Sequence, residues 1–491
     1  MENAAYSRTT DWKIVYSSFE GVERRAVELI SKEVGERLVR EPEVYRLHVL
    51  PCVKETENTR IESSAIVIGT YDESAIVRRF ITEEELPDGA YAVKVVRNPE
   101  CESGSIVIIT ARCAKHLYLA AAAYIDDYTV EYAPKSGSLI LRHEIYAAPL
   151  NEGLIVRRPK IETRSIFAWG HPINDYRGFI SDSARVGINQ IILWNDYAPL
   201  NAREIVEYAH SFGIEVIWGY AWGWCEGHCE NAKDLEPETL KALKEQIVEQ
   251  YDTVWRGLGD GIYFQSFTEK NVDKIGGKSI AEAVVELVND VAESLYERDP
   301  ELHIQFGLHA TSVKNELDKI AMVDKRIEIV WEDCGAFPYG YMAVKVSDQQ
   351  LQEALDFTER IIKLRGDDAK TGLVFKGFAI LDWSKSRFVH QSGPFILGEG
   401  SPLLLEHDRR LRSDSWRRYT AAWLRYGDYA RTVAEYAYKL TGGDVNLCMA
   451  GLFDGALWAP FAMCSSIFED PTESFDDVAE RVMKRKNVKI D

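Results

Sequence analysis

Carboxylic acids and indoles end several short apolar runs in the second part of this 491-residue chain. Each run is too short and too rich in β-forming residues to be a helix, so we expect buried strands that end at these polar side chains. Hydrolysis of a glycosidic bond needs one protonated carboxyl group and one ionised carboxylate. Indole rings pack against the apolar face of a pyranose. The pattern predicts sugar chemistry with four candidate catalytic residues, Glu269, Glu332, Asp333 and Asp382.

Glu269 is the candidate general acid. It follows the run Gly259–Phe267, and burial among aromatic residues would raise its pKa and keep it protonated. The alternative is a capping or solvated surface carboxylate. For the second carboxylate we favour Glu332 or Asp333. Adjacent residues on a strand face opposite ways, so we expect only one of them to reach the cavity, and the alternative for both is a salt bridge to barrel arginines. Asp382 is the reserve candidate.

Other polar and aromatic residues near the strand ends are candidates for substrate binding. Each tryptophan taken alone is more often a core residue, and each histidine is as often a hydrogen-bonding residue. The alternation of tryptophans with small residues in 218–224 nevertheless favours a cavity wall. Arg164, together with Lys376 and Arg387, is a candidate to hold a substrate carboxylate. The substrate-binding candidates are Trp169, His171, Asp196, Trp222, Trp224, His309, Arg164 and Trp383.

Cysteine spacing offers one weak metal motif. Cys225, His228 and Cys229 follow the third predicted strand, with Cys334 as a fourth possible ligand. Structural zinc sites use two separated ligand pairs, so free thiols are the favoured interpretation and no metal is predicted. Neither a GxGxxG nor a GxxxxGK[ST] motif occurs, and no cofactor is predicted.

Strands and helices alternate from about residue 160 onward. Seven or eight strands in this rhythm favour a (β/α)8 TIM barrel, whose chemistry gathers at the carboxyl ends of the strands. The eighth strand, within 445–458, could also be a closing helix. The expected strands are 161–170, 188–196, 214–224, 259–269, 303–311, 327–333, 372–382 and 445–458. The expected helices are 175–186, 202–212, 236–258, 279–298, 313–322, 348–365 and 413–440.

The first 155 residues predict a small α/β sandwich domain. A helical pattern within 14–53 precedes strands at 60–70, 90–97 and 105–110, and an alanine-rich helix follows at 115–127. No catalytic constellation occurs there, so a scaffold role is expected. The predicted domains are 1–155, the catalytic barrel 156–465 and a C-terminal helical tail 466–491. The aromatic helix 413–440 is expected to pack on the barrel, with a homodimer face as the alternative.

Charge and composition narrow the class of partner. Lysine plus arginine total 58 against 78 acidic residues, a formal charge of −20, which disfavours nucleic acid and acidic membrane surfaces. The eight cysteines are scattered as in reduced proteins, and the first residues lack a signal-peptide pattern. We therefore expect a cytoplasmic protein with an oligosaccharide substrate.

The layout resembles a known group of enzymes. A strand ending in Ile68-Gly69-Thr70 and the run 104–110, which leads into an Ala/Tyr-rich helix, precede a barrel whose fourth strand ends in a carboxylate. This is similar to glycoside hydrolase family 67 α-glucuronidases and, more distantly, to families 20 and 84. The resemblance implies an exo-acting glycosidase, with Glu269 as acid and a terminal uronic acid as substrate. Family 20 has an Asp-Glu pair where this chain has Thr268-Glu269.

Three other functions stay open from the sequence. A β-N-acetylhexosaminidase-like glycosidase would share the predicted acid but would need a different helper for the acetamido group. A non-catalytic carbohydrate-binding barrel would keep the tryptophans while its carboxylates point away from the cavity. A metal-dependent barrel enzyme would use Cys225, His228 and Cys229. The sequence does not choose between retention and inversion, which depends on the separation of the carboxylates.

Overall fold

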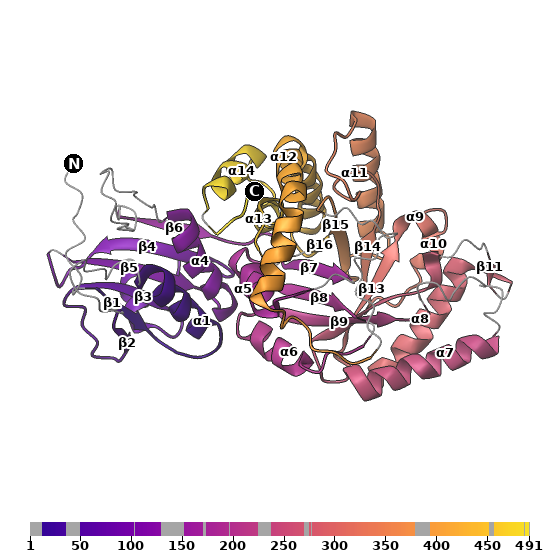
Figure 1. Cartoon of the computed structure of the whole chain (residues 1–491), viewed down its shortest axis with the longest axis horizontal. Helices are drawn as coiled ribbons and strands as arrows, with labels where there is room; N and C mark the ends of the chain where they lie inside the picture. Colours follow the sequence, from indigo (N-terminus) through magenta and orange to yellow (C-terminus); the bar gives the residue numbers. More distant parts are fainter. Residues whose placement is uncertain are drawn as a thin grey trace.

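A closed parallel barrel and a smaller mixed sheet make up the molecule, with helices packed around both (Figure 1). The structure is a computed structural model. It describes residues 12–35, 50–102, 104–128, 152–169, 173–195, 197–223, 237–269, 274–275, 277–378, 393–450, 456–485 and 487–490.

The N-terminal domain is built on a six-stranded sheet in the order β2-β1-β3-β5-β4-β6. Strand β3 lies inside the sheet and is buried along its whole length, which fits its run of apolar and β-branched residues. Its strands are β1 (Trp12–Tyr16), β2 (Cys52–Lys54), β3 (Ser64–Thr70), β4 (Tyr91–Arg97), β5 (Ser105–Ala111) and β6 (Gly153–Arg157). Its helices are α1 (Gly21–Ile30), α3 (Ala75–Phe80) and α4 (Leu117–Tyr128).

Eight parallel strands close the barrel, in chain order around the ring. This confirms the predicted (β/α)8 barrel preceded by an α/β domain and followed by helices. The barrel strands are β7 (Thr163–Trp169), β8 (Gln190–Trp194), β9 (Glu215–Ala221), β10 (Gly261–Gln265), β13 (His303–His309), β14 (Glu328–Glu332), β15 (Thr371–Phe375) and β16 (Asn446–Ala450).

Helices form the outer layer of the barrel. Two of them begin with reciprocal capping boxes, Ser279 with Glu282 and Ser347 with Gln350, so the sequence defines their starts locally. The longer helices are α5 (Tyr176–Arg185), α6 (Ala202–His210), α7 (Pro237–Gln250), α8 (Ile280–Tyr296), α11 (Asp348–Ile362), α12 (Pro402–Thr441), α13 (Ala459–Glu469) and α14 (Phe475–Lys484). Among the helices described, none combines the length and apolar character that a bilayer crossing requires.

Side chains inside the barrel form layers. An apolar layer, which includes Phe167, Trp194, Tyr263 and Val330, fills the middle of the barrel. Every second residue of a strand points inward, so polar residues that share the parity of this layer occupy the two ends of the interior. The barrel is therefore a packed core whose chemistry is confined to its ends.

Charged pairs join the N-terminal domain to the barrel. Arg185, at the end of α5, binds Asp126 of α4 at 2.5 Å and Glu33 at 2.7 Å. Arg485, after α14, binds Asp127 at 2.8 Å. Figure 1 shows α13 and α14 beside this junction. Because buried charges need partners, these pairs favour one way of docking the N-terminal domain on the barrel.

Several boundaries differ from the sequence-based expectations. The helix expected over 313–322 is two short helices, α9 (Ala310–Val313) and α10 (Leu317–Ile320). The helical pattern expected within 14–53 begins with strand β1, which the sheet pairs with both β2 and β3. The seventh barrel strand ends at Phe375 instead of 382. Tertiary pairing overrides local propensity in these places.

The aromatic face of α12 packs on the barrel. Trp416 and Trp423 are buried, and Trp423 lies edge-on to Phe337 and stacks on Phe378. These contacts agree with the expected packing of residues 413–440. Trp423 also donates a hydrogen bond to the carbonyl of Gly377 at 3.0 Å, so α12 holds the segment that follows β15.

Candidate functional site

Glu332 ends strand β14 and lies inside the carboxyl end of the barrel. It follows the inward-facing Val330 by two residues, and only 4% of it is exposed. Its Oε1 accepts hydrogen bonds from the Tyr263 hydroxyl and from Gln265 Nε2, both at 2.8 Å. Tyr263 and Gln265 share the inward face of β10, which β13 separates from β14, so this carboxylate is held across the barrel interior.

Asp333 joins Glu332 at the same place, contrary to the expected alternation. Its φ of +54° lies in the left-handed region, beyond the last extended residue of the strand. This turn brings both carboxylates to Lys376 Nζ, at 2.5 Å from Asp333 Oδ1 and 3.3 Å from Glu332 Oε2. The expectation that the two side chains face opposite ways is wrong, because the strand ends between them. A strained backbone residue of this kind is common at functional sites.

Lys376 comes from the end of β15 and is almost fully buried, with 2% exposure. It follows the inward-facing Val374 by two residues, and its backbone N–H donates to the carbonyl of Pro338 at 2.6 Å. The Tyr341 hydroxyl lies 3.4 Å from Nζ, and the ring centroid of Tyr341 lies 4.5 Å away. The loop after β14 therefore encloses the ammonium group.

His309 ends strand β13 and completes the cluster. Its Nδ1 lies 2.5 Å from Asp333 Oδ2, and its Nε2 lies 3.7 Å from Glu332 Oε2. The carboxyl-end cluster is defined here as Tyr263, Gln265, His309, Glu332, Asp333, Tyr341 and Lys376. It draws on the ends of the consecutive strands β10, β13, β14 and β15 and on the loop after β14.

The charges in this cluster are set by one another. Burial alone would raise the pKa of Glu332, but Lys376 and His309 outweigh it and lower that pKa. Burial likewise opposes ionisation of Asp333, yet the hydrogen bond from His309 and the charge of Lys376 lower its pKa to about 2. Burial would lower the pKa of Lys376, and the two carboxylates raise it instead. Both carboxylates are therefore ionised at neutral pH and can accept a proton or attack a carbon, but neither can donate a proton.

Glu269 lies close by along the backbone. It ends a short 3-10 turn, Phe267–Glu269, just after β10, and this turn packs against β13 and α9. Its side chain lies outside the described part of the structure, so its role as general acid stays a prediction. The alternative of a solvated surface carboxylate also stays open.

Other predicted residues also fall outside the description. Trp169 closes β7, but its side chain is not part of the described structure. The remaining ones are His171, Asp196, Trp224, Asp382 and Trp383, together with Arg387 and the thiol motif Cys225, His228 and Cys229. Their predicted roles stay predictions.

Trp222 lies in the layer between the barrel and its helices. Its side chain is fully buried and stacks on Phe264, with ring centroids 3.7 Å apart. Tyr263 faces the barrel interior, so its neighbour Phe264 faces the helices, and Trp222 shares that outer layer. The structure does not place Trp222 at the predicted substrate site. Its burial is the physical reason, because a sugar cannot reach it.

Arg164 lies at the opposite end of the barrel from the cluster. It is the second residue of β7, has 2% exposure, and donates to the carbonyls of Gly187 at 2.7 Å and Ile161 at 2.5 Å. It therefore stabilises backbone at the amino end instead of facing a substrate carboxylate. Its position early in the strand was the signal for this.

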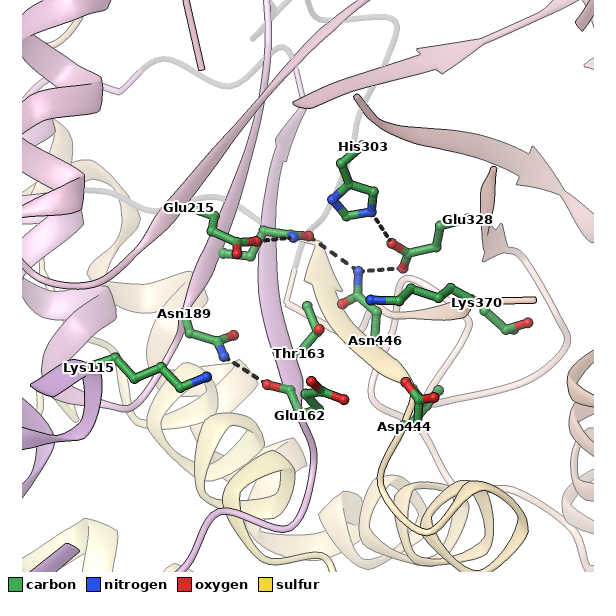
Figure 2. Close-up of a pocket in the computed structure, with 13 residues that line it drawn as sticks. Lys115, Glu162, Thr163, Asn189, Glu215, His303, Glu328, Lys370, Asp444 and Asn446 are labelled. Carbon is green, nitrogen blue, oxygen red and sulfur yellow. Dashed lines mark hydrogen bonds and ion pairs between the residues drawn. The ribbon is translucent and has the colours of Figure 1, made fainter. Parts of the chain in front are cut away.

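A polar pocket opens at that amino end (Figure 2). Its volume is about 160 Å³, and its floor holds a buried carboxylate, Glu328. Glu328 accepts hydrogen bonds from His303 and Asn446, both at 2.8 Å. The lining residues are Lys115, Glu162, Thr163, Asn189, Gln190, Glu215, His303, Glu328, Lys370, Thr371, Asp444, Val445 and Asn446. Because the floor satisfies its own polar groups, this pocket is a polar end layer of the barrel and not the predicted site.

Three members of the cluster had no predicted place in catalysis or binding: Tyr263, Gln265 and Tyr341. Gln265 carries a readable signal, since it continues the inward parity of Tyr263 on an otherwise apolar strand. Tyr341 carries none, because it comes from a loop. Among described residues, no group of three or more His, Cys, Asp or Glu side chains is placed to hold a metal ion. Cys334, suggested as a fourth metal ligand, is buried.

Comparisons with known proteins place the fold. No family model and no curated protein sequence matches the chain. Among solved structures, it is similar to a family GH20 exo-β-N-acetylglucosaminidase from Vibrio harveyi, with a TM-score of 0.50 at 10% identity over 97% of this chain and 73% of the other.

Two further structures give slightly lower scores. A family GH20 β-N-acetylhexosaminidase from Streptomyces coelicolor A3(2) has a TM-score of 0.49 at 12% identity, over 96% of this chain and 90% of the other. A family GH115 4-O-methyl-α-glucuronidase, BtGH115A, has 0.48 at 13%, over 96% of this chain and 58% of the other. At such low identity the likeness to the Vibrio harveyi protein establishes the fold alone. The resemblance to barrel glycoside hydrolases therefore holds at the level of the fold.

Proposed function

We propose that this protein is a glycoside hydrolase that acts on the terminal sugar of oligosaccharides. The observation that carries the proposal is the carboxyl-end cluster, in which two ionised carboxylates lie with a histidine at the end of the barrel where such enzymes act. The fold likeness to glycoside hydrolases is in keeping with it.

The cluster divides the roles of its two carboxylates. Glu332 is buried, accepts hydrogen bonds from Tyr263 and Gln265, and lies beside Lys376. Because all these contacts are within the protein, its role is to position its neighbours. The side chain of Asp333 is 23% exposed and ionised. Asp333 is therefore the carboxylate that activates water or attacks the anomeric carbon.

The proton donor must be a different residue, because the pKa values of Glu332 and Asp333 are both lowered. Glu269 is our proposed acid, since its backbone lies beside β13, which carries His309. Asp382 is kept as the reserve for the second carboxylate. Whether the anomeric configuration is retained or inverted is read from the product by NMR.

The test is a screen of aryl glycosides and short oligosaccharides, with products followed by chromatography. It compares wild type with Glu269→Gln and Asp333→Asn, and uses Asp444→Asn as a matched control at the other end of the barrel. Loss of a general acid or base lowers the rate by about 10²–10⁴-fold. We expect losses of that order in both site variants and none in the control.

Two outcomes would contradict these assignments. Full activity of Glu269→Gln on a cleaved substrate would remove Glu269 as the acid. Binding of sugars by wild type without cleavage of any compound would favour the non-catalytic carbohydrate-binding barrel instead. That alternative has one observation in its favour, because both carboxylates of the cluster are paired within the protein.

The screen includes N-acetylhexosaminides and uronides. The GH20 proteins similar in fold are named for N-acetylhexosamine substrates. Here Thr268 stands before the proposed acid and is buried, so it supplies no carboxylate to orient an acetamido group. A cytoplasmic location is also part of the proposal, supported by the free thiols of Cys334, Cys448 and Cys464. A homodimer that uses the helix 413–440 as its interface stays an alternative proposal.

A further inference from the structure

Lys376 is surrounded by acceptors from its own protein. Three oxygens lie within 3.4 Å of its Nζ, one each from Asp333, Glu332 and Tyr341. An ammonium group has three hydrogens, so these oxygens match its donors in number. With 2% exposure, Lys376 has no surface left for a ligand. The sequence-based idea that Lys376 holds a substrate carboxylate does not fit this geometry.

The groups around Lys376 leave the cluster rich in acceptors. Glu332 and Asp333 bring two carboxylates to a single ammonium group. His309 turns its Nδ1 to Asp333, and the buried Oε1 of Gln265 has no hydrogen-bond partner in the structure described. A ligand that enters here meets carboxylate and amide oxygens, which are acceptors, while the hydrogens of Lys376 are already directed at oxygens of the protein. It must supply hydroxyl or ammonium donors, and a ligand carboxylate placed beside Asp333 would meet a second carboxylate.

We propose that Lys376 is the internal counter-ion of Glu332 and Asp333, and that the terminal sugar bound beside them is neutral or cationic and not a uronic acid. This rests on the proposed function, of which it specifies the substrate class. Lys376 is then a positioning residue, since it acts through the two carboxylates. Asp333 selects the charge of the substrate in addition to its chemical role.

The test compares binding of matched sugars to the Glu269→Gln protein, in which the side chain keeps its size and turnover is blocked. The probes are 4-nitrophenyl hexosides, 2-amino-2-deoxyhexosides and hexuronides of the gluco and galacto series, both anomers, measured by isothermal titration calorimetry. One like-charge contact at partly buried positions corresponds to about a tenfold or larger change in affinity. We expect the neutral and cationic probes to bind at least about tenfold tighter than the hexuronide of the same configuration.

Charge variants distinguish selection of the substrate's charge from a general loss of sugar binding. Asp333→Asn removes one negative charge from the cluster and is expected to narrow the ratio of hexoside to hexuronide affinity by about threefold or more. Asp444→Asn makes the same chemical change at the amino end and should leave the ratio unchanged. The pH dependence of hexuronide binding gives a second readout, since protonation of the ligand carboxyl at low pH should relieve the repulsion.

The outcomes are distinct. Tighter binding of a hexuronide than of its matched hexoside would overturn the inference while leaving a glycosidase in place. An unchanged affinity ratio in Asp333→Asn would also overturn it. If no probe binds wild type or the variant, and no glycoside is cleaved, the proposed function itself fails.

Discussion

Replacing Lys376 by methionine is expected to cost about 3–5 kcal/mol of stability at neutral pH, because two buried carboxylates lose their shared cation. The structure supplies the scale of the effect. The pKa of Asp333 falls from 3.8 to about 2 in the folded protein, which corresponds to about 2 kcal/mol for His309 and Lys376 together at roughly 1.36 kcal/mol per unit. Glu332 has a lowered pKa as well, so its loss adds to this amount.

The sign of the pH dependence follows from the lowered pKa values. A carboxylate whose pKa is lowered by folding stabilises the fold above its unfolded pKa, near 3.8 for Asp333, and loses that effect as the pH falls through about 2. In Lys376→Met the described residues that still face Asp333 are His309 and Glu332, with Tyr341 beside them. The deficit should therefore be greatest at pH 7 and shrink below about pH 4, where carboxylates take up protons.

Urea denaturation followed by tryptophan fluorescence at about pH 7 and about pH 3 measures the deficit on both sides of the range in which the carboxylates take up protons. Lys370→Met is the matched control, because this exposed lysine directly precedes β15 as Lys376 follows it. Glu332→Gln should destabilise wild type but partly restore stability in the Lys376→Met background, since it removes one uncompensated charge. A deficit no larger than that of Lys370→Met, or no rescue by Glu332→Gln, would refute the counter-ion reasoning.

Three further outcomes are expected. Trp222→Ala should lower the free energy of unfolding by about 3–5 kcal/mol, measured by urea denaturation. Trp222→Phe should leave KM unchanged, because the Nε1 of Trp222 has no hydrogen-bond partner among the described residues. Arg164→Met should lower stability without changing the preference among sugars, as judged by kcat/KM on the substrate panel, because Arg164 serves backbone carbonyls at the amino end. Burial lowers the pKa of His303, but the hydrogen bond and charge of Glu328 outweigh burial, so the pKa is raised overall. The charge of Glu215 also raises this pKa, and that of Lys370 lowers it. This contribution to stability is complete below pH about 6.5 and lost as the pH rises through the raised pKa, so the urea midpoint should fall between pH 6 and 9 and should fall less in Glu328→Gln.

Much of the fold was predictable because its signals are local. Apolar runs such as Ile327–Trp331 and Ile188–Trp194 predict strands, and the capping residues Ser279 and Ser347 mark where helices begin. Alternation of such elements favours a barrel. The order of strands around the ring then follows from short right-handed connections. What local patterns did not predict was β1, whose strand state depends on pairing with distant β2 and β3.

The candidate site was predictable only in part. The position of Glu332 and Asp333 at a strand end is a sequence feature, and so is the parity that turns Gln265 inward. That both carboxylates converge depends on the left-handed conformation of Asp333 and on Lys376, which comes from the next strand and pairs with both. The alternation of side chains along the strand predicts that Trp222 faces the helices and not the barrel interior. The cluster of tryptophans in 218–224 instead favoured a cavity wall.

The sequence by itself determined that a barrel would place carboxylates at one rim, because strand periodicity and polar strand ends are properties of neighbouring residues. Only the tertiary structure decided which charges meet. Lys376 lies 43 residues from Asp333 along the chain, and their ion pair exists because β14 and β15 are neighbours in the barrel. Electrostatic interaction depends on distance and burial, and both are set by packing between elements that the chain separates.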